Sequence, residues 1–219
     1  LLVSSAASDV YKRQELKEVY ENGIISSNSV LMTHMACADN PDDPMNEMQI
    51  NKFEKAFDIV ERKTKRSICN SACLMNFPQL SFDWVRSGIA AYGGESKNLN
   101  LKTAMTFRAP IISIRNIRKG ERVGYGGRKK ASKDMRIAIV YAGYADGIPQ
   151  TTIDGTKVLV NDKQAVIFGR VSMDLVSIDI TNLPQVSEND LVSFWCEELP
   201  INEFSNNNGL ISYELMTRI

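Results

Sequence analysis

The feature that most constrains the fold is a change in the spacing of turn residues near residue 100. From residue 103 on, pairs of turn-forming residues follow one another closely: Lys119-Gly120, Gly126-Gly127, Asp146-Gly147, Asp154-Gly155 and Asn161-Asp162. Such pairs favour tight turns between strands. Ile112 and Ile114 alternate with Ser113 and Arg115, which predicts a half-buried strand. We therefore expect a mainly antiparallel β domain over residues 101–219.

The preceding residues alternate between strand-like and helix-like patterns, which favours parallel βα units. In the clearest helix, Phe53, Ala56, Phe57 and Val60 share one face at amphipathic spacing. We also expect a helix over residues 15–22, strands over 29–35, 67–70 and 85–91, a proline-containing loop over 40–44, and a polar connection over 93–101.

Composition argues against several classes of partner and site. Lys and Arg together number 26, as do Asp and Glu, so no net charge favours nucleic acid or a membrane surface. No apolar run reaches the roughly 18 residues that a membrane-spanning helix needs. Cys37, Cys69, Cys73 and Cys196 form no Cys-x-x-Cys motif, and with a single histidine they indicate no zinc site. We expect free thiols, no bound metal and a cytoplasmic location.

Two tyrosines lie on glycine-flanked turns. Tyr125 occurs in Gly124-Tyr-Gly-Gly127, and Tyr144 occurs in Gly143-Tyr-Ala-Asp-Gly147. Glycine lets the backbone bend sharply and lets another group approach, so either hydroxyl could act as an acid or base or bind a ligand oxygen. The alternative is a pair of hairpin turns with exposed tyrosines.

Seven segments, in order along the chain, resemble the alanine racemase family. They are Met32-Thr-His-Met-Ala-Cys-Ala-Asp39, Asn70-Ser-Ala72, Asp83-Trp-Val-Arg-Ser-Gly-Ile-Ala-Ala-Tyr-Gly93, Val123-Gly-Tyr-Gly-Gly127, Gly143-Tyr-Ala-Asp-Gly147, Gly169-Arg-Val-Ser-Met-Asp174 and Ile211-Ser-Tyr-Glu-Leu-Met-Thr-Arg-Ile219. Each is short and weak alone, whereas all of them in order are highly specific. The resemblance implies an α/β plus β fold: the C-terminal part of a (β/α)8 barrel over residues 15–100, then a β-rich domain over 101–219.

The two ends of the chain depart from the family. Residues 4–14 match no part of it and look like a translated transposon-based sequencing adapter, so we treat residues 1–14 as a non-native segment. A genuine variable extension is the alternative. The family's cofactor-bearing lysine would precede residue 15, and the family continues past Ile219. We therefore expect a fragment open at both ends, with an incomplete barrel and no activity by itself.

The resemblance implies the interconversion of L-alanine and D-alanine with pyridoxal 5′-phosphate. Inversion needs an acid/base group on each face of the α-carbon, and by resemblance these are the upstream lysine and Tyr125. A phenol is a weak acid, so a cation is needed to favour its phenolate, and Arg86 and His34 occupy matching family positions. Arg86 would also face the pyridine nitrogen of the cofactor, and His34 would hydrogen-bond Arg86 or Tyr125. The structural alternatives are an Arg86–Asp83 ion pair and a core histidine.

The cofactor phosphate would be bound by Ser71, by the backbone amides of Gly88 and Ile89, and by Tyr213. Backbone N–H groups after the carboxyl ends of barrel strands commonly bind phosphate in this architecture. The alternative for Tyr213 is a buried core tyrosine. These assignments rest on the resemblance alone.

On the substrate side, the Met173 N–H would bind the carboxylate of alanine and Tyr144 would narrow the entrance. In the family these groups reach the other subunit's barrel, so the resemblance implies a homodimer with shared sites. Ile148 and Gln150 stand where many members have an aromatic residue and an arginine, and Ala90-Ala91 replaces a larger apolar pair.

Two other functions stay open. One is a racemase of serine, lysine or several amino acids, and the other is a non-catalytic cofactor-binding relative. Retention of Tyr125 and Tyr213 favours a small pocket and hence alanine, with D-alanine supplied for peptidoglycan.

Overall fold

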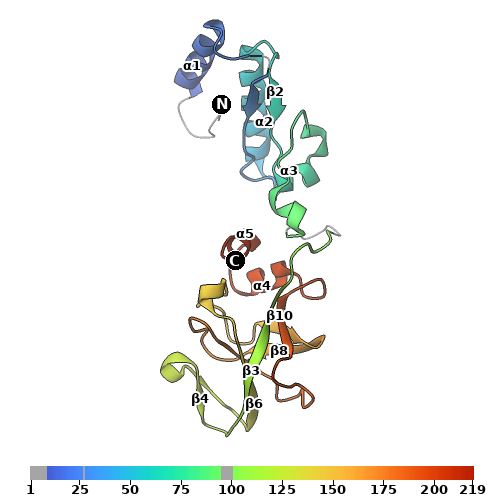
Figure 1. Ribbon diagram of the computed structural model, residues 1–219. Helices are drawn as coiled ribbons and strands as arrows, with labels where there is room; N and C mark the ends of the chain where they lie inside the picture. Colours follow the sequence, from blue (N-terminus) through green and yellow to red (C-terminus); the bar gives the residue numbers. More distant parts are fainter. Residues whose placement is uncertain (1–8, 27, 95–100) are drawn as a thin grey trace. The chain divides into compact units, whose positions relative to one another are not determined.

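Figure 1 shows the computed structural model, which describes residues 9–26, 28–94 and 101–219, with side chains from residue 14 on. The described residues form two compact units. The first extends to Ala90, and the second comprises residues 91–94 and 101–219. Most of the connection predicted over residues 93–101 lies outside the described residues, as do residues 1–8 of the segment interpreted as non-native.

The first unit contains a parallel βαβ arrangement. β1 (Val30–Met32) and β2 (Lys65–Ser67) pair in parallel, and α2 (Pro44–Ile59) connects them, as the alternating pattern predicts. The other elements are α1 (Asp9–Glu21), α3 (Ser71–Asn76) and the 3₁₀ turn η1 (Pro78–Leu80). A second 3₁₀ turn, η2 (Gly88–Tyr92), begins in this unit and ends in the next.

The limits and the buried face of helix α2 follow from its sequence. Asp43 caps it by accepting a hydrogen bond from the Met45 N–H at 2.9 Å, and Pro44 occupies the first turn, where no N–H is required. Phe53, Ala56 and Phe57 are buried, as predicted. They pack in one core with Leu31, Met35, Ile68, Cys69 and Cys73.

Several predicted boundaries in this unit are wrong. Helix α1 begins at Asp9 rather than residue 15, because no glycine or proline interrupts residues 9–14 and a nucleated helix extends readily. The strand predicted over residues 29–35 covers only Val30–Met32. The strand predicted over residues 67–70 lies at Lys65–Ser67, because Asn70 already caps α3.

The strand predicted over residues 85–91 is absent from the described structure. The segment makes two backbone hydrogen bonds with the β2 region, from Trp84 N–H to Arg66 and from Arg86 N–H to Cys69. Gly88 then takes a φ of 37° and the chain turns into η2. A left-handed residue cannot continue a strand, so the ladder stops there.

The second unit is built on a closed antiparallel barrel with the strand order β10-β3-β6-β9-β8-β7. Pairing of Val192 with Val160 joins β10 to β7 and closes the ring. The predicted antiparallel β domain is therefore confirmed. The strands are β3 (Phe107–Ile117), β6 (Met135–Val140), β7 (Lys157–Val160), β8 (Lys163–Ile167), β9 (Val176–Asp179) and β10 (Leu191–Trp195).

Shorter elements accompany the barrel. A hairpin of β4 (Arg122–Val123) and β5 (Lys129–Lys130) encloses η3 (Tyr125–Gly127), and η4 (Tyr144–Asp146) follows β6. Helices α4 (Ile201–Asn207) and α5 (Ser212–Met216) complete the unit. No helix in the described part of the chain has the length and apolar character needed to traverse a bilayer.

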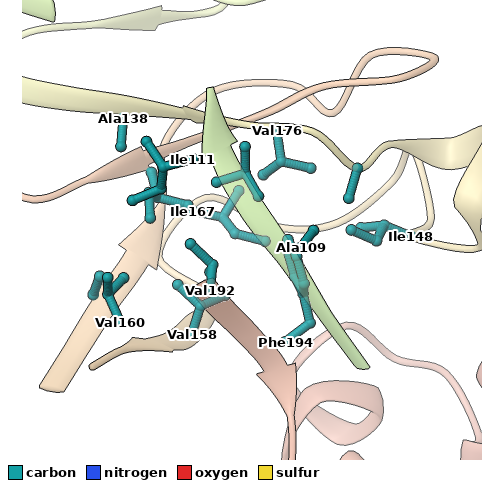
Figure 2. Close-up of a cluster of buried hydrophobic side chains, with 14 of the residues drawn as sticks. Ala109, Ile111, Ala138, Ile148, Val158, Val160, Ile167, Val176, Val192 and Phe194 are labelled. Atoms are coloured by element: carbon teal, nitrogen blue, oxygen red, sulfur yellow. The ribbon is translucent and has the colours of Figure 1, made fainter. Parts of the chain in front are cut away.

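Alternating apolar residues from the strands fill the barrel. Figure 2 shows side chains such as Ile111, Ile167 and Val176 gathered in the interior, and all are buried. Each such side chain contributes roughly 1.5–3 kcal/mol when removed from water. The predicted alternation around Ile112 is wrong in register: the β3–β6 pairing shifts between Ile111 and Ser113, so Ile111 is buried and Ile112 is exposed.

The predicted turns are confirmed by their backbone conformations. Gly120, Gly126, Gly147 and Gly155 have φ values of 95°, 72°, 96° and 91°. Asn161 and Asp162 also take positive φ, in the turn between β7 and β8. Glycine and asparagine reach this region at low cost, which explains why these pairs mark turns.

Candidate functional site

Arg86 bridges the ends of both parallel strands of the first unit. Its guanidinium donates hydrogen bonds to the Thr33 carbonyl at 2.7 Å and to the Ser67 hydroxyl. Ser67 ends β2 and Thr33 directly follows β1, so the guanidinium lies at the carboxyl ends of the strand pair. Asp83, the alternative partner, instead accepts a hydrogen bond from a backbone N–H.

Ser71 ties α3 to η2. Its buried hydroxyl donates to the Ser87 carbonyl and accepts from the Ala90 N–H at 3.2 Å. Gly88 therefore lies beside Ser71, and a Cβ added to Gly88 would be 3.5 Å from the Ser71 Oγ. Within the described residues, the Gly88 and Ile89 N–H groups have no hydrogen-bond partner. The two free amides are donors of the kind that bind phosphate, whereas the single Ser71 O–H already donates to the Ser87 carbonyl.

His34 follows β1 and is exposed, so it is not a core histidine. Its Nε2 lies 3.2 Å from the Asn70 Nδ2, which also donates to the Met35 carbonyl at 2.9 Å. The hydrogen bond expected between His34 and Arg86 is not among those formed by the described residues.

Asn70 is a contributor that the sequence reasoning missed. Besides holding His34, its side chain caps α3 by accepting from the Cys73 N–H at 2.9 Å. Asparagine directly before the first helical residue is a recognised N-cap signal, so this role was accessible from the sequence.

The cysteines are free, as predicted. Burial raises the pKa of the Cys69 and Cys73 thiols, and the nearby Arg86 charge opposes that shift. Burial also lowers the pKa of the Arg86 guanidinium, which the two thiols oppose. Because a guanidinium starts from a pKa above about 12, Arg86 keeps its charge at neutral pH.

Tyr125 lies at the turn of the β4–β5 hairpin in the second unit. The flanking Gly124 and Gly126 have φ values of 81° and 72°. A Cβ on Gly124 would lie 2.9 Å from the Arg170 backbone nitrogen, so this turn packs tightly on residues 169–174. The Tyr125 side chain is 72% exposed. The glycines thus let the hairpin dock while the phenol projects into solvent.

The Tyr144 and Met173 turns pack on each other. The Tyr144 and Ala145 N–H groups donate to the Ser172 and Met173 carbonyls at 3.0 and 2.9 Å. A Cβ on Gly143 would lie 2.1 Å from the Met173 carbonyl oxygen, so only glycine permits this contact. The Met173 side chain is 53% exposed. Within the described residues its N–H has no hydrogen-bond partner and so can bind an anion.

The C-terminal segment contacts the same region. A Cβ on Gly147 would lie 2.9 Å from the Ile219 Cγ1 and 3.1 Å from the Arg218 carbonyl oxygen. Tyr213, in α5, has an exposed side chain and is not a core tyrosine. The segment that bears Tyr213 is therefore anchored to the turn that bears Tyr144.

Residues 124–127, 143–147 and 169–174 together form what we call the turn cluster. A hollow of about 310 Å³ lies here, lined by Tyr125, Arg170 and Ser172 among others. That volume suits a small ligand. Arg170 belongs to the Gly169–Asp174 motif, but the sequence did not indicate a function for it. Its position in the lining of this hollow identifies it as a candidate site residue.

Ile148 and Gln150, two of the positions that depart from the family, differ in their location. Ile148 is fully buried among the barrel side chains drawn in Figure 2, whereas Gln150 is exposed. The isoleucine therefore belongs to the core of the β domain and does not line the hollow at Tyr125.

The structure collects the predicted site residues into two sets. The first unit holds His34, Ser71, Arg86, Gly88 and Ile89, which we call the strand-end site. The second unit holds the remaining predicted residues, Tyr125, Tyr144, Met173 and Tyr213.

Family models match both units. The model described as Alanine racemase, N-terminal domain, matches residues 13–96, and the one described as Alanine racemase, C-terminal domain, matches residues 104–219. The chain is 38% identical to alanine racemase of Alteromonas mediterranea, over 98% of this chain and 60% of that protein. It is 38% identical to the biosynthetic alanine racemase of Pseudomonas aeruginosa, over 86% of this chain and 54% of that protein.

Solved structures give the same result. The crystal structure of the biosynthetic alanine racemase from Pseudomonas aeruginosa matches with a TM-score of 0.91 and 33% identity, over 100% of this chain and 63% of that one. Alanine racemase from Bartonella henselae, solved with covalently bound pyridoxal phosphate, matches with a TM-score of 0.84 and 26% identity, over 94% and 59%. The chain thus spans less than two thirds of these relatives.

Proposed function

The chain belongs to the alanine racemase family, and on that premise we propose that it serves the interconversion of L-alanine and D-alanine with pyridoxal 5′-phosphate. The product D-alanine would serve peptidoglycan synthesis in the cytoplasm, where free cysteines such as the four here are the rule. Residues 15–100 correspond in this proposal to the C-terminal part of a (β/α)8 barrel, and residues 101–219 to the β domain.

The observation that carries the proposal is the turn cluster. The chain has an exposed phenol at Tyr125 and a cation at Arg170 around one hollow. Beside it lies the Met173 N–H, which has no hydrogen-bond partner among the described residues. Racemisation of an amino acid requires an acid/base group on each face of the α-carbon and an anion site for the carboxylate. The turn cluster would supply one of the two acid/base groups and the anion site.

The strand-end site has the donors that pyridoxal 5′-phosphate needs. The Gly88 and Ile89 N–H groups suit its phosphate, and glycine at position 88 leaves that approach open. The Ser71 hydroxyl would join them by turning from the Ser87 carbonyl, to which it donates here. Tyr213 would complete the phosphate contacts from α5. Arg86 suits the pyridine nitrogen, because its guanidinium is held by the Thr33 and Ser67 oxygens and does not readily release a proton.

When bound, the cofactor acts as an electron sink for the α-carbon. Tyr125 would remove the α-proton of L-alanine, or return a proton to form it. The Met173 N–H would bind the substrate carboxylate and Tyr144 would restrict the entrance. His34, held by Asn70, would orient the polar groups at the strand ends. Arg86 would keep the pyridine nitrogen unprotonated, which weakens the sink and limits side reactions.

The two sets of residues are proposed to meet across a homodimer. The turn cluster of one subunit would face the strand-end site of its partner, so each active site needs both chains. Arg86→Ala and Tyr125→Phe would then complement each other, because a heterodimer has one site without either lesion. Subunit exchange without any return of activity contradicts this arrangement.

The proposal is tested in a chimera in which residues 15–219 of this chain replace the matching part of the Pseudomonas aeruginosa enzyme, whose own residues before and after that part are kept. We expect it to bind pyridoxal 5′-phosphate, seen as a visible absorbance band, and to racemise alanine faster than serine or lysine. Faster turnover of serine or lysine would instead identify a racemase of another amino acid. A folded chimera that binds the cofactor without racemising any of them would identify a non-catalytic relative.

A further inference from the structure

Two buried cysteines lie on either side of Asn70 and Ser71, where helix α3 begins. Cys69 follows β2 and Cys73 lies in α3, and their Sγ atoms are 2.7 Å apart. Both thiols are free and buried. A disulfide bond is about 2.03–2.05 Å long, so the two sulfurs need to approach by less than about 1 Å to bond.

We propose that Cys69 and Cys73 are a redox-sensitive pair, which a hydroperoxide converts to an intrachain disulfide, and that this modification changes anion binding at Ser71. The effect on anion binding rests on the function proposed above, whereas the formation of the disulfide depends only on the two thiols.

The oxidation balances with hydrogen peroxide as the oxidant. One thiolate attacks a peroxide oxygen, the O–O bond breaks, and the sulfur becomes a sulfenic acid with release of water. The second thiol then attacks that sulfur, forms the S–S bond and displaces a second water. Two thiols and one peroxide thus give one disulfide and two waters, with two electrons passing from sulfur to oxygen.

The position of the pair connects it to the strand-end site. A Cys69–Cys73 bond would close a ring that contains both Asn70, which holds His34, and Ser71. The Cys69 carbonyl also accepts the Arg86 N–H at 2.9 Å. Closing the ring would restrict the backbone conformation that positions the side chains of Asn70 and Ser71 and the carbonyl of Cys69. By linkage, an anion bound at Ser71 must in turn shift the equilibrium between the two thiols and the disulfide.

Burial sets the conditions for oxidation. The thiolate is the reactive form, and burial raises the pKa of both thiols, with Arg86 as the opposing charge. We therefore expect slow oxidation at neutral pH and a rate that increases as pH rises, because more of the pair ionises.

Trypsin separates the cysteines and so provides the test. Cleavage after Arg66 and Arg86 places Cys69 and Cys73 in one peptide, while Cys37 and Cys196 fall in two others. The native chain is treated with hydrogen peroxide, unfolded in acid, alkylated and digested. We expect the residue 67–86 peptide to lose two hydrogens and both alkyl groups together, with a faster rate at higher pH.

Two variants serve as controls for the disulfide. Cys37→Ser should leave the disulfide unchanged, whereas Cys73→Ala should abolish it and leave Cys69 alkylatable or carrying added oxygen. The redox pair is overturned if Cys69 and Cys73 gain oxygen separately in the native protein, or if both stay alkylatable at peroxide doses that modify Cys37.

The coupling is tested by equilibrating the chain in mixtures of reduced and oxidised glutathione, with and without inorganic phosphate or pyridoxal 5′-phosphate. We expect either anion to shift the ratio of disulfide to dithiol at Cys69 and Cys73 at least twofold, and Ser71→Ala to remove the effect. An unchanged ratio with both anions overturns the link to Ser71 and weakens the proposed phosphate site, while the redox pair stands. Failure of the disulfide itself leaves the proposed racemase function untouched.

Discussion

The strand-end site and the turn cluster present their functional groups in different ways. Ser71 is buried and Arg86 is held by the Thr33 and Ser67 oxygens, so their positions depend on side-chain hydrogen bonds. In the turn cluster, Tyr125 and Met173 are exposed, and their positions depend on backbone turns packed on one another. A side chain held by buried bonds is coupled to stability, whereas an exposed one on a rigid turn can be changed without unfolding the protein.

The largest effect is expected in the turn cluster, where the functional side chains are exposed. Tyr125→Phe in the chimera should slow α-proton exchange from L-alanine roughly 10²–10⁴-fold, because it removes a general acid–base group. The free energy of unfolding should change by no more than about 0.5 kcal/mol, since the side chain is exposed. Deuterium incorporation from solvent into each enantiomer of alanine gives the exchange rates, and denaturant unfolding gives the free energy of unfolding.

Tyr141→Phe is the matched control, because Tyr141 is also exposed in the same unit but lies outside the turn cluster. It should leave both measurements unchanged. Equal and minor losses with L-alanine and D-alanine in Tyr125→Phe would remove this residue from the mechanism.

The second prediction tests whether backbone packing holds the turn cluster. Gly143→Ala should destabilise the chain by about 3 kcal/mol, because the added Cβ would lie 2.1 Å from the Met173 carbonyl oxygen. Gly209→Ala is the control: its φ is 66° and a Cβ would meet nothing within 4 Å. It should cost only about 1 kcal/mol, from backbone conformation. Urea unfolding of both variants measures the difference, and similar costs would show that the contact between the turns does not matter.

The third prediction concerns the strand-end site. Ser71→Ala should lower the free energy of unfolding by about 1–2 kcal/mol, because the Ser87 carbonyl and the Ala90 N–H each lose a buried partner. Tyr125→Phe should leave stability unchanged in the same unfolding experiment. If Ser71→Ala is also neutral, the distinction between the two regions fails.

The smallest effect is expected at the barrel core. Ile148→Val should cost about 0.5–1.5 kcal/mol, because one methylene is removed from a fully buried side chain. The preference of the chimera for alanine over serine should not change, since Ile148 is fully buried and does not line the hollow. A shift in that preference, measured from kcat/KM for each amino acid, would place Ile148 in contact with the substrate path.

The first half of the chain illustrates what local patterns can predict. The amphipathic spacing of Phe53, Ala56 and Phe57 correctly identified α2, because helical periodicity is a property of the local sequence. The strand expected over residues 85–91 was wrong, because an apolar run does not reveal that Gly88 turns the chain. Asn70 and Arg170 lay within recognised motifs, yet their contacts with His34 and with the Tyr125 hollow come from residues distant in sequence.

The sequence by itself determined the family resemblance, the division near residue 100 and the turns at Gly120, Gly126 and Gly147. Each of these features depends on residues that are close together in the sequence. Only the tertiary structure decided the closure of the six-stranded barrel and the bulge that buries Ile111 in place of Ile112. It also decided that Cys69 and Cys73 touch. These features depend on how strands pair and how loops pack, and no local pattern specifies which distant residues will meet.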